Sequence, residues 1–173
     1  MPLKQLISQA EIAEIVTRLA HQIDQDYQGR SPLVIGILNG SMIFLADLVR
    51  SMATPIKQIM FIHLSSYGSS RQSSGKVTIK ADLPESLIRD QDLLIVEDIV
   101  DTGNSWAALY PQLLALNPRS IKICTLLDKP CRRQIAVSLD YVGHRVEDGF
   151  IVGYGLDWKE QYRQLPDIYQ WRP

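Results

Sequence analysis

The chain has 173 residues, 46% of them hydrophobic, which is enough apolar material to bury the core of one ordinary domain. Its 18 basic and 19 acidic residues give a formal net charge of −1, which argues against nucleic acid or an anionic membrane as a partner. No apolar run approaches the roughly 18 residues of a membrane span, and the first residues lack the apolar core of a signal peptide. We therefore expect a soluble, cytoplasmic protein in which any anionic ligand is held by a local site.

The first third of the chain predicts a helix, a strand and a second helix. Ser8 and Glu11 form a capping box, and apolar residues then recur at helical spacing until the chain reaches Gly29. The apolar run at 33–38 predicts a buried strand, which ends at a break before a second helical pattern that begins at Ser41.

The rest of the chain continues this alternation. Further strands are expected at 58–64, 76–83, 92–98, 120–127, 141–146 and 150–155. A helix is expected at 103–117, with a kink at Pro111. Because buried strands alternate with helices, we expect an α/β fold with a mainly parallel central sheet flanked by helices, in a single domain from 1 to 173. Ligands of such sheets bind beyond the carboxyl ends of the strands.

The strongest chemical signal is the string VEDIVDTGNS at 96–105, which leads from a strand into a helix. Residues 102–105 offer hydroxyls, an amide and backbone N–H groups at a helix N-terminus, where a phosphate is favoured. The missing Gly-Lys pair excludes a Walker-type loop. Asp101 would repel a bound phosphate, so it more plausibly serves another part of the ligand as a proton acceptor or donor.

Two adjacent carboxylates, Glu97 and Asp98, end the strand before this loop. Neighbouring strand residues face opposite sides, so the pair suits sugar hydroxyls and a hard cation such as Mg²⁺ better than paired acid catalysis. An isolated acid pair would more simply be two solvated residues of a helix-capping loop. The whole ten-residue string favours the functional interpretation.

The extended string LLIVEDIVDTGNS at 93–105 resembles the phosphoribosyl pyrophosphate motif of hypoxanthine/guanine phosphoribosyltransferases, which belong to the type I phosphoribosyltransferase family. Four further segments match that family in order and spacing, at 36–48, 65–70, 123–130 and 150–157. The resemblance implies the type I fold, with a mobile lid hairpin at about 65–75 and a small C-terminal hood that includes 141–173.

The resemblance also implies a role for each matching position. Glu97 and Asp98 would hold the ribose hydroxyls, and Asp101 would face purine N7 as the general acid/base. The 5-phosphate would be cradled by Thr102, Gly103, Asn104 and Ser105. The purine would be bound by Lys129 at its 6-oxo group, by stacking on Phe150, and by main-chain groups of Ile151 and Asp157.

The remaining implied roles concern the leaving group, the metal and the lid. Pyrophosphate would meet Asn39, Gly40 and Arg163, next to a cis peptide bond between Leu38 and Asn39. Magnesium would be placed by Glu97, Asp98 and Asp157. The lid would contribute Ser66 and Tyr67.

Two positions depart from the family pattern. Asn39 stands where the family usually has Lys or Arg, which predicts weaker pyrophosphate binding. Gly149 precedes Phe150 where the family often has Lys or Glu, which predicts a looser hood and leaves base preference open.

The function implied is purine salvage: transfer of the 5-phosphoribosyl group from phosphoribosyl pyrophosphate to hypoxanthine and/or guanine, giving IMP or GMP and pyrophosphate. One alternative is an enzyme that prefers xanthine or guanine, and another is a non-catalytic regulator that retains the fold. Members of the family are generally homodimers or homotetramers, so we expect the same here.

Overall fold

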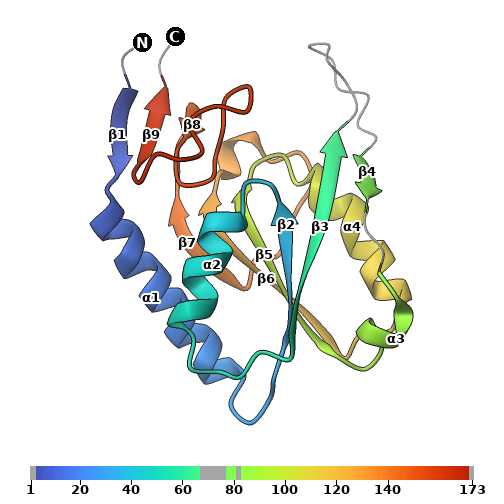
Figure 1. Cartoon of the computed structure of the whole chain (residues 1–173). Helices are drawn as coiled ribbons and strands as arrows, with labels where there is room; N and C mark the ends of the chain where they lie inside the picture. The colour runs from blue at the N-terminus through green and yellow to red at the C-terminus, as the bar shows by residue number, and fades with distance from the viewer. Residues whose placement is uncertain (1–2, 67–76, 81–82, 172–173) are drawn as a thin grey trace.

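The computed structural model describes residues 3–66, 77–80 and 83–171. Its larger sheet has six strands in the order β4-β3-β2-β5-β6-β7 (Figure 1). The strands are β2 Leu33–Leu38, β3 Gln58–Ser66, β4 Val77–Lys80, β5 Asp92–Val100, β6 Ser120–Asp128 and β7 Tyr141–Arg145. Five of them run parallel from β3 to β7, and β4 is antiparallel to β3 at one edge. The expected α/β fold with a mainly parallel central sheet is confirmed.

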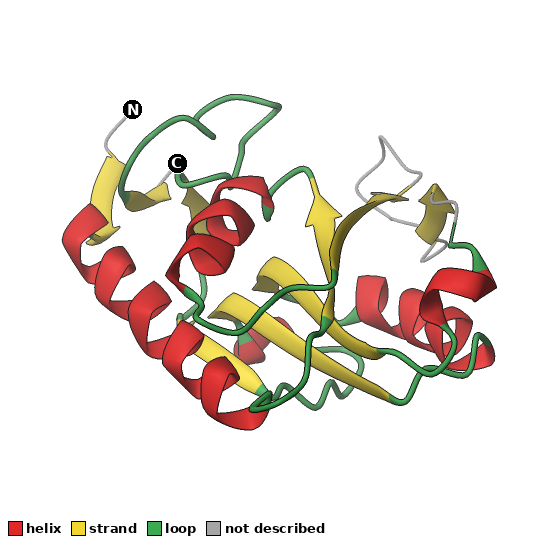
Figure 2. Cartoon of the chain, turned by 60° about the horizontal axis from the view of Figure 1, so that its bottom comes forward, coloured by secondary structure: helices red, strands yellow, loops and turns green. Residues whose placement is uncertain are grey.

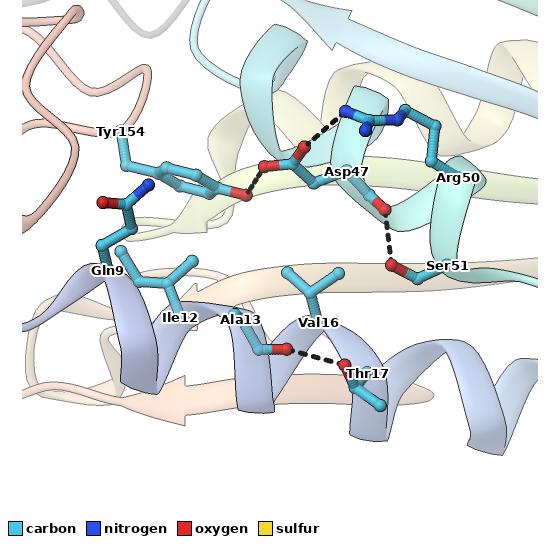
Figure 3. Close-up of a pocket in the computed structure, with 9 residues that line it drawn as sticks. All are labelled: Gln9, Ile12, Ala13, Val16, Thr17, Asp47, Arg50, Ser51 and Tyr154. Carbon is cyan, nitrogen blue, oxygen red and sulfur yellow. Dashed lines mark hydrogen bonds and ion pairs between the residues drawn. The ribbon is translucent and has the colours of Figure 1, made fainter.

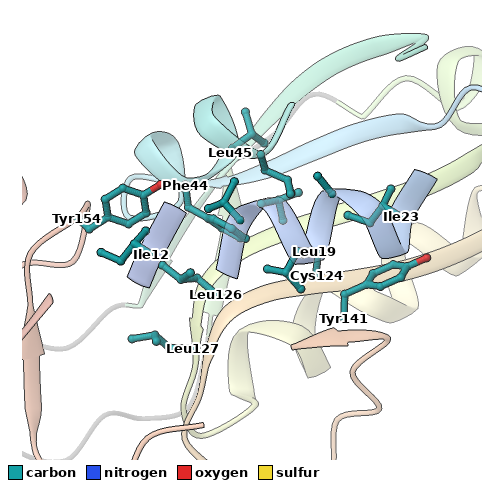
Figure 4. Packing of buried hydrophobic residues seen from close by; sticks show 14 of the residues in the cluster. Ile12, Leu19, Ile23, Phe44, Leu45, Cys124, Leu126, Leu127, Tyr141 and Tyr154 are labelled. Atoms are coloured by element: carbon teal, nitrogen blue, oxygen red, sulfur yellow. The ribbon is translucent and has the colours of Figure 1, made fainter. Parts of the chain in front are cut away.

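Helices cover both faces of this sheet, as Figures 1 and 2 show. They are α1 Gln9–Asp26, α2 Met42–Ser51, α3 Glu85–Ile88 and α4 Asn104–Ala115, with a 3₁₀ turn at Pro130–Arg132. Alternate residues of β2 and β5 separate into two cores: Val34 and Leu94 lie in the cluster with α1 and α2, whereas Ile35 and Ile95 lie in the cluster with α4. Figure 4 shows the first cluster, where α1 lies over the sheet. This alternation is the period of two that places successive strand residues on opposite faces.

The helix ends follow the local sequence. The Ser8 hydroxyl accepts the N–H of Glu11, and the Glu11 carboxylate accepts the N–H of Ser8, so the expected capping box closes the start of α1. Helix α4 continues past Pro111, which lies on its exposed face. The carbonyl that loses its intrahelical donor there can be hydrated, which explains why the helix does not end at the proline.

A smaller antiparallel sheet is built from both ends of the chain. Its order is β1-β9-β8, with β1 at Leu3–Ile7, β9 at Ile168–Trp171 and β8 at Phe150–Val152. In Figure 1 it lies beyond the upper ends of the central strands. We use the word hood for residues 150–171.

The structure corrects the expected limits of the hood. Residues 141–145 form β7, the edge strand of the larger sheet, and not part of the hood. Strand β8 ends at Val152 and not at residue 155, because Gly153 and the two residues after it have positive φ angles and turn the chain. Strands β1 and β9 were not expected, since each is short and they pair with one another from opposite ends of the chain.

Ser66 is the last residue of β3, whereas Tyr67 and most of the expected lid lie outside the described residues. Within the part of the chain that the structure describes, no helix is long and apolar enough to cross a membrane.

Candidate active site

The loop after β5 passes directly into α4 and requires glycine at its turn. Gly103 has a φ of +86°, and a Cβ atom there would lie 2.5 Å from the carbonyl oxygen of Ile135. Both the conformation and the space therefore favour glycine. The Asn104 N–H donates to the Thr102 hydroxyl at 3.3 Å. The loop thus presents residues 102–105 at the N-terminus of α4, where backbone N–H groups favour an anion.

Residues 129–135, which we call the bracing segment, hold the carbonyls of this loop one after another. The Lys129 N–H donates to the Val100 carbonyl at 3.0 Å, and the Arg133 Nε donates to the Asp101 carbonyl at 2.9 Å. The Thr102 carbonyl accepts the N–H groups of residues 134 and 135 at 2.9 and 3.1 Å. Because each carbonyl is bonded, the loop is preset before any ligand arrives.

Arg133 was missed by the sequence interpretation. Its side chain is 16% exposed and bonds the Val100 carbonyl at 3.0 Å and the carboxylate of Asp128, in addition to the Asp101 carbonyl. One guanidinium thus ties the end of β5 to the end of β6. The signal that could have found it is the Arg132-Arg133 pair directly after a strand end, at the sheet edge where ligands bind.

A cavity of about 220 Å³ lies at the carboxyl ends of β5 and β6. It is lined by Asp98, Ile99, Asp101, Lys129, Arg132, Gly149, Phe150, Ile151, Leu156 and Asp157. The fold thereby brings together all the residues expected to contact the purine, and it adds Ile99, Arg132, Gly149 and Leu156. The cavity lining defined by the described residues does not include Asn39, Gly40, Glu97, Arg163 or residues 102–105, which flank it.

Asp101 presents an unpaired oxygen at this cavity. Its Oδ1 is buried and has no hydrogen-bond partner among the described residues, while its Oδ2 lies 3.4 Å from Nη1 of Arg132. A buried acceptor without a partner costs about 1–3 kcal/mol. Such a cost is typical of a site whose missing partner is a ligand.

Lys129 is 4% exposed in its side chain and points to the start of the hood. Its Nζ donates to the Gly149 carbonyl at 2.6 Å and lies 3.3 Å from the Asp148 carboxylate. An ammonium group has three N–H donors, so a further one is open to a ligand. Gly149 was expected to loosen the hood, but its carbonyl is held by this bond from Lys129. A Cβ atom on Gly149 would lie 2.2 Å from the side-chain nitrogen of Gln170.

Phe150 forms an aromatic wall with two tryptophans. Its ring meets those of Trp158 and Trp171 edge-on, at centroid distances of 4.7 and 5.8 Å. The residue is 36% exposed, and the next residue, Ile151, is 8% exposed. The two tryptophans therefore fix the ring while part of it stays open to the cavity.

Glu97 and Asp98 point to different surroundings, as expected for neighbours on a strand. Burial, and then the nearby Asp98 charge, raise the pKa of Glu97 to about 8. Burial likewise raises the pKa of Asp98 to about 6, even though Arg163 favours its charged form. Both carboxyl groups are thus desolvated, and a cation or hydroxyl donors would favour their charged forms.

Two of the three expected magnesium ligands, Asp98 and Asp157, lie at the cavity, and the third, Glu97, is next to Asp98 in the chain. Within the described residues, no group of three or more His, Cys, Asp or Glu side chains could hold a metal ion alone. Asp98 and Asp157 do line the same cavity. Magnesium binds through one or two carboxylates with waters and substrate oxygens, so these two residues fit it. Glu97 precedes Asp98 on β5.

The segments expected to meet pyrophosphate converge beside Asp98. The Leu38–Asn39 peptide bond is cis, as expected. A Cβ atom on Gly40 would lie 1.7 Å from the Asp98 carboxylate, and one on Gly155 would lie 2.1 Å from the Gly40 carbonyl, so these three residues are in close contact. Arg163 donates to the Gly155 carbonyl at 2.8 Å and pairs with Asp157 at 2.9 Å.

Comparison with known proteins agrees with this geometry. A family model described as a phosphoribosyl transferase domain matches residues 3–159. Over 165 residues the chain is 44% identical to the hypoxanthine-guanine phosphoribosyltransferase of Bacillus subtilis, covering 95% of this chain and 91% of that protein. The chain belongs to the hypoxanthine phosphoribosyltransferase family. A solved hypoxanthine-guanine phosphoribosyltransferase of Bacillus anthracis superposes with a TM-score of 0.91 at 40% identity, covering 99% of this chain and 100% of the other.

Some relatives of this phosphoribosyltransferase chain are longer. It is 42% identical over 165 residues to a protein of Listeria innocua named bifunctional protein TilS/HprT, and it spans 25% of that protein's length. The similarity covers 95% of this chain, so the family unit is shared although the relative carries additional sequence.

Proposed function

We propose that the chain transfers the 5-phosphoribosyl group from phosphoribosyl pyrophosphate to hypoxanthine and/or guanine, giving IMP or GMP and pyrophosphate, as a step of purine salvage. The observation that carries this proposal is the cavity in which Asp101, Lys129 and Phe150 meet beside Asp98 and Asp157. The names of the relatives support the same reaction class.

The purine would lie against Phe150 with its 6-oxo group toward Lys129. An ammonium donor pairs with an oxo acceptor but faces the donor hydrogens of a 6-amino group, so adenine would be disfavoured. Main-chain groups of Ile151 and Asp157 would read the remaining edge of the base. The choice among hypoxanthine, guanine and xanthine depends on that edge.

The phosphoribosyl group would lie between the loop after β5 and the hood. Thr102, Gly103, Asn104 and Ser105 would bind the 5-phosphate at the N-terminus of α4. Glu97 and Asp98 would accept hydrogen bonds from the ribose hydroxyls. Ser66 and Tyr67 belong to the proposed lid, which would exclude water from the reacting centre.

Asn39, Gly40 and Arg163 would contact the pyrophosphate. Asp98 and Asp157 would hold magnesium, together with the neighbouring Glu97. When bound, the ion offsets the charge that builds up on the leaving group. The cytoplasmic location and the homodimeric or homotetrameric state stay predictions.

In the reaction, purine N9 forms a bond to ribose C1 while the bond from C1 to the pyrophosphate oxygen breaks. The transition state resembles that of glycosyl transfer, with positive charge on the ribose. Asp101 would accept or donate the proton at purine N7 while N9 acts as the nucleophile. Its unpaired Oδ1 is the atom suited to this transfer.

The test is Asp101→Asn. General acid/base groups contribute on the order of 10² to 10⁴ in rate, so kcat should fall within that range while phosphoribosyl pyrophosphate still binds. Asp26→Asn, the same change outside the cavity, serves as the control and should keep the wild-type rate. A near-wild-type rate for Asp101→Asn would rule out the proposed role.

A further inference from the structure

Tyr154 lies on the hood in a backbone conformation that needs an explanation. It has a φ of +50° and stands between Gly153 and Gly155, whose φ angles are +100° and +99°. A bulky residue with positive φ is uncommon and persists where its surroundings fix it. A glycine at this position would adopt the same φ without strain, so the contacts of the tyrosine side chain must offset the strain.

The Tyr154 side chain points away from the proposed active-site cavity and lies between α1 and α2. Tyr154 is 6% exposed and belongs to the same buried cluster as Ile12 and Val16 of α1 (Figures 3 and 4). Its hydroxyl donates to Oδ2 of Asp47 on α2 at 2.7 Å. Burial and this bond raise the pKa of the phenol, so it stays a donor over the physiological range. Tyr154 thus anchors the hood to α2.

The anchored turn carries groups that face the leaving-group end of the site. The Tyr154 N–H donates to the Leu165 carbonyl at 2.8 Å, and the Gly155 N–H donates to the Arg163 carbonyl at 2.9 Å. Arg163 returns a bond from its guanidinium to the Gly155 carbonyl and pairs with Asp157. Hydrogen bonds and an ion pair thus link Tyr154, Gly155, Arg163 and Asp157 into one unit.

Asp47, which accepts the bond from Tyr154, lies on α2, and this helix leads back to the leaving-group end of the site. Helix α2 starts at Met42, directly after the cis peptide and Gly40. Gly40 contacts Asp98 on one side and Gly155 on the other. The bond between Tyr154 and Asp47 therefore closes a ring of contacts that runs from α2 through Gly40 to Gly155 and back.

We propose that Tyr154 is a positioning residue for the phosphoribosyl pyrophosphate substrate. Its hydroxyl, through Asp47, fixes the separation between Gly40 and the unit that carries Arg163 and Asp157. The anchor sets the affinity for the pyrophosphate end of the substrate through Arg163, and the purine contacts of Lys129 and Phe150 lie outside the anchored unit. This inference rests on the proposed function.

The matched variant is Tyr154→Phe, which keeps the buried ring and removes the hydroxyl. Loss of one hydrogen bond to a carboxylate should raise the KM for phosphoribosyl pyrophosphate about tenfold, while the KM for hypoxanthine and kcat stay within about twofold. Hydrogen exchange at the amides of Gly155 and Leu165 should accelerate about tenfold in the same variant. Asp47→Ala should reproduce both changes, and the double variant should add little to either single one.

Arg50→Gln is the control, because it removes an exposed ion pair with the same Asp47 and leaves the tyrosine bond intact. It should change neither KM nor exchange. Tyr154→Phe with a wild-type KM for phosphoribosyl pyrophosphate overturns the positioning role, even where exchange is faster, and equal rises in both KM values overturn its selectivity. A wild-type chain without turnover would instead overturn the proposed function and the positioning role with it.

Discussion

The two walls of the cavity are held in different ways. The carbonyls of Val100, Asp101 and Thr102, at the end of β5 and in the loop after it, are bonded by the bracing segment, which follows the neighbouring strand β6. The hood is held by contacts between residues far apart in the chain, such as Tyr154 with Asp47 and the pairing of β9 with β1. One wall is therefore preset by adjacent strands of the parallel sheet, whereas the other depends on a few separate anchors.

This difference matches the tasks proposed for the two walls. A preset loop aligns Asp101 and the amides proposed to bind the 5-phosphate without reorganisation, which is how an enzyme stabilises a transition state efficiently. An anchored hood can admit the purine and the second substrate, since a few side-chain bonds can open at low cost. Changes to the loop should therefore reduce the rate most, and changes to the hood should act more on binding.

The largest effect outside the catalytic residues is expected from Arg133→Gln. This change removes the bonds to Val100 and Asp101 and leaves Asp128 buried without its inner partner. Breaking a buried ion pair from one side costs about 3 kcal/mol, and displacing a catalytic loop by about 1 Å costs about 100-fold in rate. Steady-state kinetics and thermal unfolding measure the two effects.

Arg145→Gln is the matched control, because Arg145 is 77% exposed and lies 3.5 Å from the same Asp128 without touching the loop. An exposed pair of this kind contributes about 0–1 kcal/mol, so rate and stability should stay near wild type. If Arg133→Gln behaved like Arg145→Gln, the loop would not depend on the bracing segment.

The wall formed by the loop after β5 could be predicted from the sequence, because the signals for it lie close together in the chain. The apolar run at 93–96, the capping box of α1 and the glycine at position 103 are signals that lie within a few residues. Together they located the sheet, the loop at 100–105 and the edge where ligands bind. A parallel sheet then leaves few alternatives for where the strand ends meet.

The anchors of the hood could not be predicted in this way. Nothing near Tyr154 in the sequence indicates Asp47, its partner 107 positions away. Strand β1 likewise has its pairing partner, β9, at the other end of the chain. Such pairings depend on three-dimensional proximity, which local propensity does not encode.

A smaller effect is expected from Asp26→Asn, which weakens the scaffold and touches neither wall. Hydrogen bonds from Lys122 and Tyr141, at 2.6 and 2.7 Å, lower the pKa of Asp26 from its ordinary 3.8. Its stabilisation is present above pH 3.8 and is lost as the pH falls through the lowered pKa. The variant should therefore be less stable than the wild type by about 1 kcal/mol or less at neutral pH.

This difference in stability should shrink as the solution is acidified below the ordinary pKa of aspartate. Thermal or urea unfolding over a pH series measures it, and turnover should not change. A difference that grew on acidification would contradict the assignment of the lowered pKa.

The most direct test of the proposed function is product formation from phosphoribosyl pyrophosphate and magnesium, with hypoxanthine, guanine, xanthine and adenine supplied in parallel. We expect rapid nucleotide formation with hypoxanthine or guanine and little with adenine, whose amino group would face Lys129. Absence of nucleotide with every base, while phosphoribosyl pyrophosphate still binds, would contradict it and favour a regulator that retains the fold.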